Sequence, residues 1–186
     1  MDIEVIKRML PHRYPFLLLD RVDKIVENNI FAVKNVTANE NFFQGHFPAR
    51  PVMPGVLLVE SVVQAGVVLV LAKQEEENKV AYLTDIEKAK FRRMVIPGDV
   101  MNISARLLSI KKNIAKLTGE VFVENKLCVK LIFTVILQWN ISYNSAYIYR
   151  YGSKAQIRNF LLVLRYMSDI LVYIEEIQVY EKLLIN

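Results

Sequence analysis

The sequence predicts an α+β domain in which one antiparallel sheet curves around a single long helix. Residues 56–72 are apolar almost without interruption, and a helix that is apolar on nearly every face must be enclosed by other elements. Strand-like runs then follow one another along the chain with only turns between them. These runs are residues 79–86, 100–109, 114–123 and 127–137. Because strands and helices do not alternate, the pattern excludes a doubly wound parallel sheet.

Shorter elements precede the long helix. Residues 3–10 have helical spacing and stop at a proline. Residues 16–26 have the pattern of a strand with an apolar start, and a polar turn at 27–29 leads into a second strand over residues 30–36. A loop rich in Gly and Pro, residues 45–55, enters the helix, and Pro54 suits the first helical position because its missing N–H costs nothing there.

Two turns separate the later strands. Pro97-Gly98-Asp99 has turn chemistry and lies between the first two of them, and Glu124-Asn125-Lys126 predicts a tight hairpin between the last two. The chain is therefore expected to end its sheet with consecutive antiparallel neighbours.

The composition changes at residue 138. Seven of the nine tyrosines lie in the last 49 residues, which fit neither the strand pattern nor a clean amphipathic helix. We therefore divide the chain into a domain at 1–137 and a C-terminal extension at 138–186. Three explanations of the extension stay open: a helix docked on an oligomer, a partner site, or read-through of a shifted frame. We expect the extension to be dispensable for chemistry.

Bulk properties limit the function classes. The 186 residues are 53% hydrophobic and carry a net charge of +5. The single cysteine, Cys128, excludes an intrachain disulfide and fits a reducing compartment, and its apolar run predicts a packed core thiol. No secretory signal is visible, so we expect a cytoplasmic protein. Residues 56–72 are shorter than the roughly 20 that a membrane span needs, and they include Glu60 and Gln64. Neither a metal-ligand spacing nor a phosphate loop is present.

An acid and a base lie close together in the sequence around the start of the long helix. Glu60 is the one acid in the apolar run, and a buried carboxyl group is costly unless it has a purpose. Burial should raise its pKa and keep it able to donate a proton. His46, one of two histidines, lies fourteen residues earlier in the loop. The N–H of Gly55 is an unpaired donor at the positive end of the helix dipole, where an oxyanion would be held.

Gln64 follows Glu60 by one helical turn, and either orients the acid or is a satisfied polar core residue. Four cations cluster just after the strand predicted at 79–86: Lys88, Lys90, Arg92 and Arg93. Nucleic-acid binding would need more basic residues and several stacking aromatics. The cluster therefore fits either an acidic protein partner or an ordinary solvated face.

Three segments resemble a known family. They are Leu10-Pro11-His12-Arg13-Tyr14-Pro15-Phe16-Leu17-Leu18, the stretch from Gly45 to Leu57 (GHFPARPVMPGVL), and Lys90-Phe91-Arg92-Arg93 with Pro97-Gly98-Asp99. Their order and spacing over about residues 1–137 are similar to those of bacterial (3R)-hydroxyacyl-acyl-carrier-protein dehydratases of the FabZ type. This resemblance implies the hotdog fold. It also implies a lyase that converts 3-hydroxyacyl thioesters on acyl carrier protein into trans-2-enoyl thioesters in fatty-acid synthesis, without a cofactor or a metal.

The resemblance also assigns roles to residues. His46 matches the family's catalytic histidine, Glu60 its catalytic acid, and Gly55 the glycine whose N–H binds the thioester carbonyl. In that family the histidine and the acid of one site come from different protomers, which implies a homodimer, and trimers of dimers are common. Phe91 and Met94 either line the acyl tunnel or pack in the core, and His12 is expected to be structural. The basic cluster would dock the carrier protein.

Two other functions stay open. A hotdog acyl-thioesterase would use water against the thioester carbonyl and release a free acid. A non-catalytic acyl-thioester binding module would need neither His46 nor Glu60, so the presence of both residues counts against it.

Overall fold

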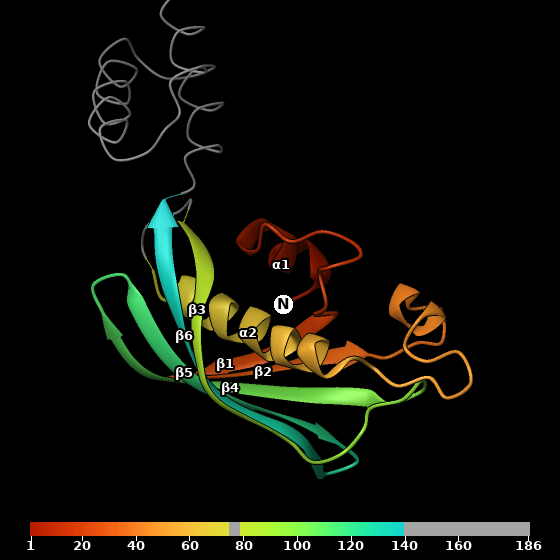
Figure 1. Ribbon diagram of the computed structural model, residues 1–186. Helices are drawn as coiled ribbons and strands as arrows, with labels where there is room; N and C mark the ends of the chain where they lie inside the picture. Colours follow the sequence, from red (N-terminus) through yellow and green to blue (C-terminus); the bar gives the residue numbers. More distant parts are fainter. Residues whose placement is uncertain (75–78, 140–186) are drawn as a thin grey trace, which may run out of the picture. The chain divides into compact units, whose positions relative to one another are not determined.

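The computed structural model describes residues 1–74 and 79–139, and Met1–Trp139 forms one compact unit. Its helices and strands, in chain order, are α1 (Ile3–Met9), β1 (Arg21–Val26), β2 (Asn29–Asn35), the 3-10 helix η1 (Asn41–Gln44), α2 (Gly55–Leu71), β3 (Lys79–Phe91), β4 (Val100–Lys111), β5 (Ile114–Val123) and β6 (Lys126–Trp139). The six strands form one sheet in the order β1-β2-β4-β5-β6-β3, and every neighbouring pair is antiparallel. The sheet curves around α2 (Figure 1), as the sequence predicts.

The core lies between α2 and the concave face of the sheet. Alternate residues of β4, β5 and β6 point inward, and Phe133, Leu117 and Met101 are fully buried against the helix. Twelve of the 17 residues of α2 are buried, which explains why the helix is apolar on nearly every face. Within the part of the chain that the structure describes, no helix has the length and apolarity needed to cross a membrane.

Two glycines let α2 approach the sheet closely. A Cβ on Gly66 would lie 2.7 Å from Cζ of Phe133 on β6. A Cβ on Gly119 would collide with Cγ1 of Val62 on α2 and lie 2.9 Å from the carbonyl oxygen of Ser104. The helix and the sheet are thus in contact at positions where no side chain fits between them.

Gly119→Ala is expected to destabilise the protein by about 1–3 kcal/mol, because the new methyl group must displace the backbone of β4 or the helix. Gly45→Ala is the matched control, since a Cβ there meets nothing within 4 Å and Gly45 has a φ of −120°. Urea unfolding followed by circular dichroism measures both changes. Equal stability of the two variants would contradict the close contact between α2 and β5.

Several predicted boundaries are corrected. α2 begins at Gly55 with Pro54 as its N-cap, so the proline precedes the helix instead of occupying its first position. β3 continues to Phe91 and so includes part of the basic cluster. β6 extends from Lys126 to Trp139, which pairs with Lys79, so the strand predicted at 127–137 is longer by one residue at its start and by two at its end. The predictions for the extension from residue 140 onward lie outside the described residues.

The strand predicted over residues 16–26 is wrong in its first part. β1 begins only at Arg21, although Leu18 and Leu19 are buried. The backbone before β1 is bonded to a side chain instead of a strand: the N–H of Leu18 donates to Oε1 of Gln64 at 2.9 Å, and the carbonyl oxygen of Phe16 accepts from Nε2 of Gln64 at 2.7 Å. An apolar run therefore reaches the core without pairing in the sheet.

The predicted turns are confirmed. Glu124 and Asn125 have φ values of 50° and 62°, the left-handed conformation at both central positions that a two-residue hairpin requires. Gly98 has a φ of 95° in the turn before β4, a conformation that favours glycine.

Strand β3 forms one edge of the sheet. It pairs with β6 on one side, and every residue from Tyr82 to Phe91 is exposed. Tyr82, Ile86 and Phe91 are among the exposed large hydrophobic residues. Long edge strands with exposed apolar side chains are normally covered, because their free N–H and C=O groups pair readily with another strand.

Candidate active site

Glu60 lies on the second turn of α2, with 18% of its side chain exposed. Gln64, one turn further on, is completely buried, and its Nε2 donates to Oε1 of Glu60 at 2.9 Å. The same amide is bonded to the backbone of residues 16 and 18, so its orientation is fixed. Both alternatives expected from the sequence fit this geometry, because Gln64 contacts the acid and is also a hydrogen-bonded polar residue of the core.

Burial raises the pKa of Glu60 above its ordinary value, while the hydrogen bond from Gln64 opposes this shift by favouring the carboxylate. Desolvation is the larger of the two effects. A carboxyl group with a raised pKa retains its proton to higher pH and is suited to donate it.

His46 lies in the loop between η1 and α2, where its Nδ1 is 2.7 Å from the carbonyl oxygen of Val52. A carbonyl oxygen only accepts hydrogen bonds, so in the neutral ring Nδ1 carries the hydrogen and Nε2 carries the lone pair. The loop backbone also holds the residue, because the N–H of His46 donates to Phe42 and its carbonyl oxygen accepts from Val52. This arrangement leaves Nε2 as a base.

Gly55 is the first residue of α2, and among the described residues its N–H has no hydrogen-bond acceptor. A Cβ at this position would lie 3.1 Å from Cε1 of Phe91, so the ring packs on the glycine at the helix start. The structure thus brings Phe91 to the predicted carbonyl-binding group. Met94, the other predicted tunnel residue, is 57% exposed.

The acid and the base are not joined within one chain. Among the residues that the structure describes, no hydrogen bond or ion pair links His46 to Glu60. The residue beside the acid is instead His12, whose Nε2 is 3.6 Å from Oε1 of Glu60. The sequence suggests only a structural role for His12. Its contact with α2 depends on how residues 16–18 bind Gln64, which no local pattern reveals.

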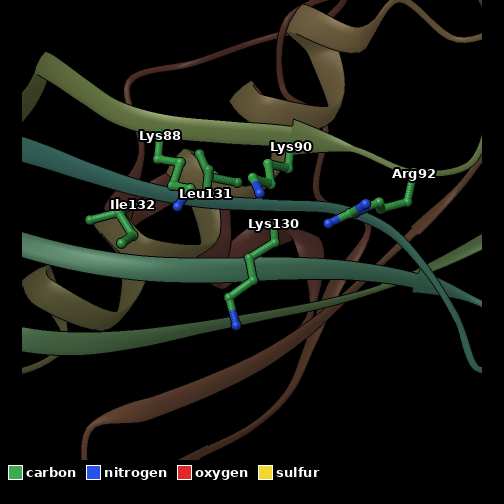
Figure 2. A pocket seen from close by; sticks show the side chains of 6 residues that line it. All are labelled: Lys88, Lys90, Arg92, Lys130, Leu131 and Ile132. Carbon is green, nitrogen blue, oxygen red and sulfur yellow. The ribbon is translucent and has the colours of Figure 1, made fainter.

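The basic cluster is divided by the structure. Lys88, Lys90 and Arg92 line a pocket of about 290 Å³ over strands β3 and β6, together with Lys130 (Figure 2). Leu131 and Ile132 complete the lining. Lys130 is absent from the predicted cluster because it is distant in sequence and meets Lys90 only through the pairing of the two strands.

Arg93 is separate from this pocket. Its NH1 donates to the carbonyl oxygen of Val123 at 3.1 Å, and its NH2 lies 3.7 Å from carboxylate oxygens of both Asp99 and Glu124. The guanidinium therefore holds the β5–β6 turn against the turn that precedes β4. Of the predicted basic cluster, Arg93 therefore does not line the pocket, whereas Lys130, outside that cluster, does.

Cys128 is fully buried in β6, and burial raises the pKa of its thiol. A buried thiol with a raised pKa is unreactive, in agreement with the expected core role.

Comparisons with known proteins match the part of the chain that contains these candidate site residues. A family model described as a FabA-like domain matches residues 10–131. A 3-hydroxyacyl-[acyl-carrier-protein] dehydratase FabZ of Clostridium botulinum (strain Loch Maree / Type A3) is 48% identical over 134 residues, which are 68% of this chain and 93% of the relative. The FabZ of Clostridium perfringens (strain SM101 / Type A) is 48% identical over 114 residues, covering 61% and 82% of the two chains.

Solved structures agree on the fold. The dehydratase heterocomplex ApeI:P from Xenorhabdus doucetiae matches with a TM-score of 0.61 at 19% identity, covering 72% of this chain and 90% of that one. A hypothetical thioesterase with coenzyme A from Streptococcus pneumoniae TIGR4 matches with a TM-score of 0.52 at 10% identity, covering 64% and 85%. At these identities the likeness shows the fold alone, and that fold is the expected hotdog.

Proposed function

We propose a function for this chain, which belongs to the FabA-like domain family. It is a lyase that dehydrates 3-hydroxyacyl groups on acyl carrier protein to trans-2-enoyl groups in fatty-acid synthesis. The observation that carries the proposal is the 48% identity to a dehydratase over 93% of its length, in a domain that holds His46 and Glu60. The buried acid with a raised pKa supports it. We also propose a cytoplasmic location, because the single cysteine, Cys128, is a buried free thiol and so fits a reducing compartment.

The proposed chemistry divides the loss of water between a base and an acid. Nε2 of His46 takes the weakly acidic C2 proton, while the thioester carbonyl oxygen accepts a hydrogen bond from the N–H of Gly55 at the positive end of α2. Glu60 gives its proton to the C3 hydroxyl, which leaves as water. The C2–H and C3–O bonds break and the C2=C3 bond forms. The proton taken by His46 returns to Glu60 through solvent before the next turnover.

The proposed site combines His46 of one protomer with Glu60 of another. Two observations support a homodimer as the working unit: the exposed apolar edge strand β3, and the absence of a hydrogen bond between the two residues within the described part of one chain. Pairing of β3 with β3 of a second copy would cover that edge by a two-fold symmetric contact. The proposal also includes trimers of such dimers.

The test is the reaction itself. Purified full-length protein is incubated with 3-hydroxybutyryl-acyl carrier protein, and the products are separated by mass spectrometry. The proposal expects enoyl-carrier protein, 18 Da lighter than the substrate by the mass of water. Release of free 3-hydroxybutyrate would instead identify a thioesterase, and binding without turnover would identify an acyl-thioester binding module.

We propose that the carrier protein docks on the four cations that line the pocket in Figure 2: Lys88, Lys90, Arg92 and Lys130. An acidic partner would be attracted by this patch of like charge, and its apolar floor at Ile132 would add contact area. Glu120 is 2.6 Å from Lys130, so one of the four cations is partly neutralised already.

Reversing Lys88 and Lys90 to Glu is expected to raise KM for the carrier-linked substrate about 10-fold or more at low salt and to weaken its salt dependence. A small pantetheine thioester should react at an unchanged rate, because it lacks the carrier's charge. Reversal of Lys111 and Lys112, two exposed lysines at the β4–β5 turn, is the matched control. Equal loss with both substrates would show that the lysines shape the acyl site instead of docking the carrier.

A further inference from the structure

His12 combines two features that no part of the proposed mechanism uses. Its Nε2 lies 3.6 Å from Oε1 of Glu60. Its Nδ1 is the only buried side-chain nitrogen or oxygen atom without a hydrogen-bond partner among residues 1–74 and 79–139. Burying a polar atom without a partner is costly, so the position of this ring calls for an explanation.

The tautomer of the ring follows from its surroundings. Burial, helped by the neighbouring charge of Arg13, lowers the pKa of His12, which keeps the ring neutral at pH 7. A neutral imidazole has one N–H and one lone pair. A buried lone pair without a donor is tolerated better than a buried N–H without an acceptor. The hydrogen is therefore on Nε2 and is directed at Glu60, and the lone pair is on Nδ1.

We propose that His12 is a positioning residue for Glu60: its Nε2–H faces Oε1 from 3.6 Å and becomes a second donor to that oxygen, beside the amide of Gln64, when the carboxylate forms. The inference rests on the proposed function of Glu60 as the acid. Because the amide of Gln64 already donates to Oε1, Oε2 is the oxygen that carries the proton to the departing hydroxyl. As that proton leaves, negative charge develops on the carboxylate, and the 3.6 Å separation shortens to a charge-assisted hydrogen bond.

The backbone around His12 is held independently of its ring. NH1 of Arg13 donates to the carbonyl oxygens of Leu10 at 2.9 Å and of His12 at 2.7 Å. The ring itself has an aromatic neighbour in Phe16, with the centroids 5.9 Å apart. A change of the imidazole therefore leaves the loop anchored, so the role of the ring is open to mutation.

The test compares three variants of the full chain. In His12→Gln the side-chain amide nitrogen reaches about the position of Nε2 and retains a donor. His12→Leu fills the space without a donor, and the amide of His12→Asn reaches only the position of Nδ1. We expect kcat for 3-hydroxybutyryl-carrier protein to fall about 10–100-fold in the Leu and Asn variants with KM within about twofold, and to stay within about threefold in the Gln variant.

The outcomes separate a positioning role from a packing role. If the ring only packs, the loss of kcat in all three variants should follow their loss of melting temperature. It should then not depend on where the side chain places a donor. If His12→Leu fails to fold, the Gln and Asn pair decides the question, because both are polar and differ in reach. Normal kcat in the Asn variant, or a loss in the Gln variant equal to that in the Leu and Asn variants, would overturn the inference. The proposed function would still stand, provided that the wild-type protein turns over the substrate. A wild-type protein that forms no enoyl product would overturn both.

Discussion

His46→Ala and Glu60→Gln are each expected to lower kcat/KM for dehydration by about 10²–10⁴-fold with the fold intact. The alanine variant removes the only nitrogen lone pair in the loop that is fixed as a base by the Val52 carbonyl. The glutamine variant retains the shape of the acid and its contact with Gln64, but has no proton to give. Steady-state kinetics with a carrier-linked substrate measure both effects.

Stability provides the control for the Glu60 variant. Because burial raises the pKa of Glu60 in the folded state, its ionisation destabilises the fold as the pH rises through that pKa. Glu60→Gln should therefore melt higher than wild type at pH 8, and this difference should shrink as the pH falls below the ordinary pKa of glutamate, where the acid is protonated in both states. Glu27→Gln, at an exposed glutamate of the β1–β2 turn that has no ion pair among the described residues, should change neither activity nor melting. Near-normal turnover in folded Glu60→Gln would exclude Glu60 as the acid.

Mixing the two inactive variants is expected to restore about one quarter of wild-type activity, if protomers exchange at random and each dimer has two sites. Half of the dimers are then hybrids. In each hybrid one site receives His46 from the Glu60→Gln chain and Glu60 from the His46→Ala chain, and the other site receives both changes. The recovery is large because each variant alone is nearly inactive.

Mass spectrometry of isotopically labelled chains confirms exchange before the activity is read. The double variant His46→Ala/Glu60→Gln mixed with either single variant is the negative control, because no combination of those chains contains an intact pair. Absence of recovery after confirmed exchange would place His46 and Glu60 of one site on the same chain. If the chains do not exchange in any mixture, they are unfolded and then refolded together.

Features encoded locally could be predicted from the sequence. The apolar face pattern identified α2 to within a residue at each end, and the turn residues identified the hairpin at Glu124 and Asn125. The error at residues 16–20 has a non-local cause, since Gln64 binds the backbone of residues 16 and 18 across more than forty residues. An apolar run has the same pattern whether it pairs with a strand or is held by a side chain.

Only part of the candidate site could be predicted from local sequence pattern. Glu60, His46 and Gly55 were chosen as candidates because the acid and the glycine interrupt or begin an apolar helix and the histidine precedes it closely, and their catalytic roles stay predictions. The approach of His12 to the acid and of Lys130 to the basic pocket depends on tertiary contacts and on strand register. These contacts have no signature in residue spacing.

The two halves of the site differ in how they withstand mutation over evolutionary time. The carbonyl that fixes the ring of His46 belongs to the backbone of Val52, and every amino acid placed at that position retains a carbonyl oxygen. The acid is oriented by the side chain of Gln64, which a single nucleotide change can replace. Neutral drift therefore preserves the orienting partner of His46 passively, whereas the orienting partner of Glu60 depends on continued selection at position 64. Of these two partners, the side chain of Gln64 should be lost first in an unused copy of this protein.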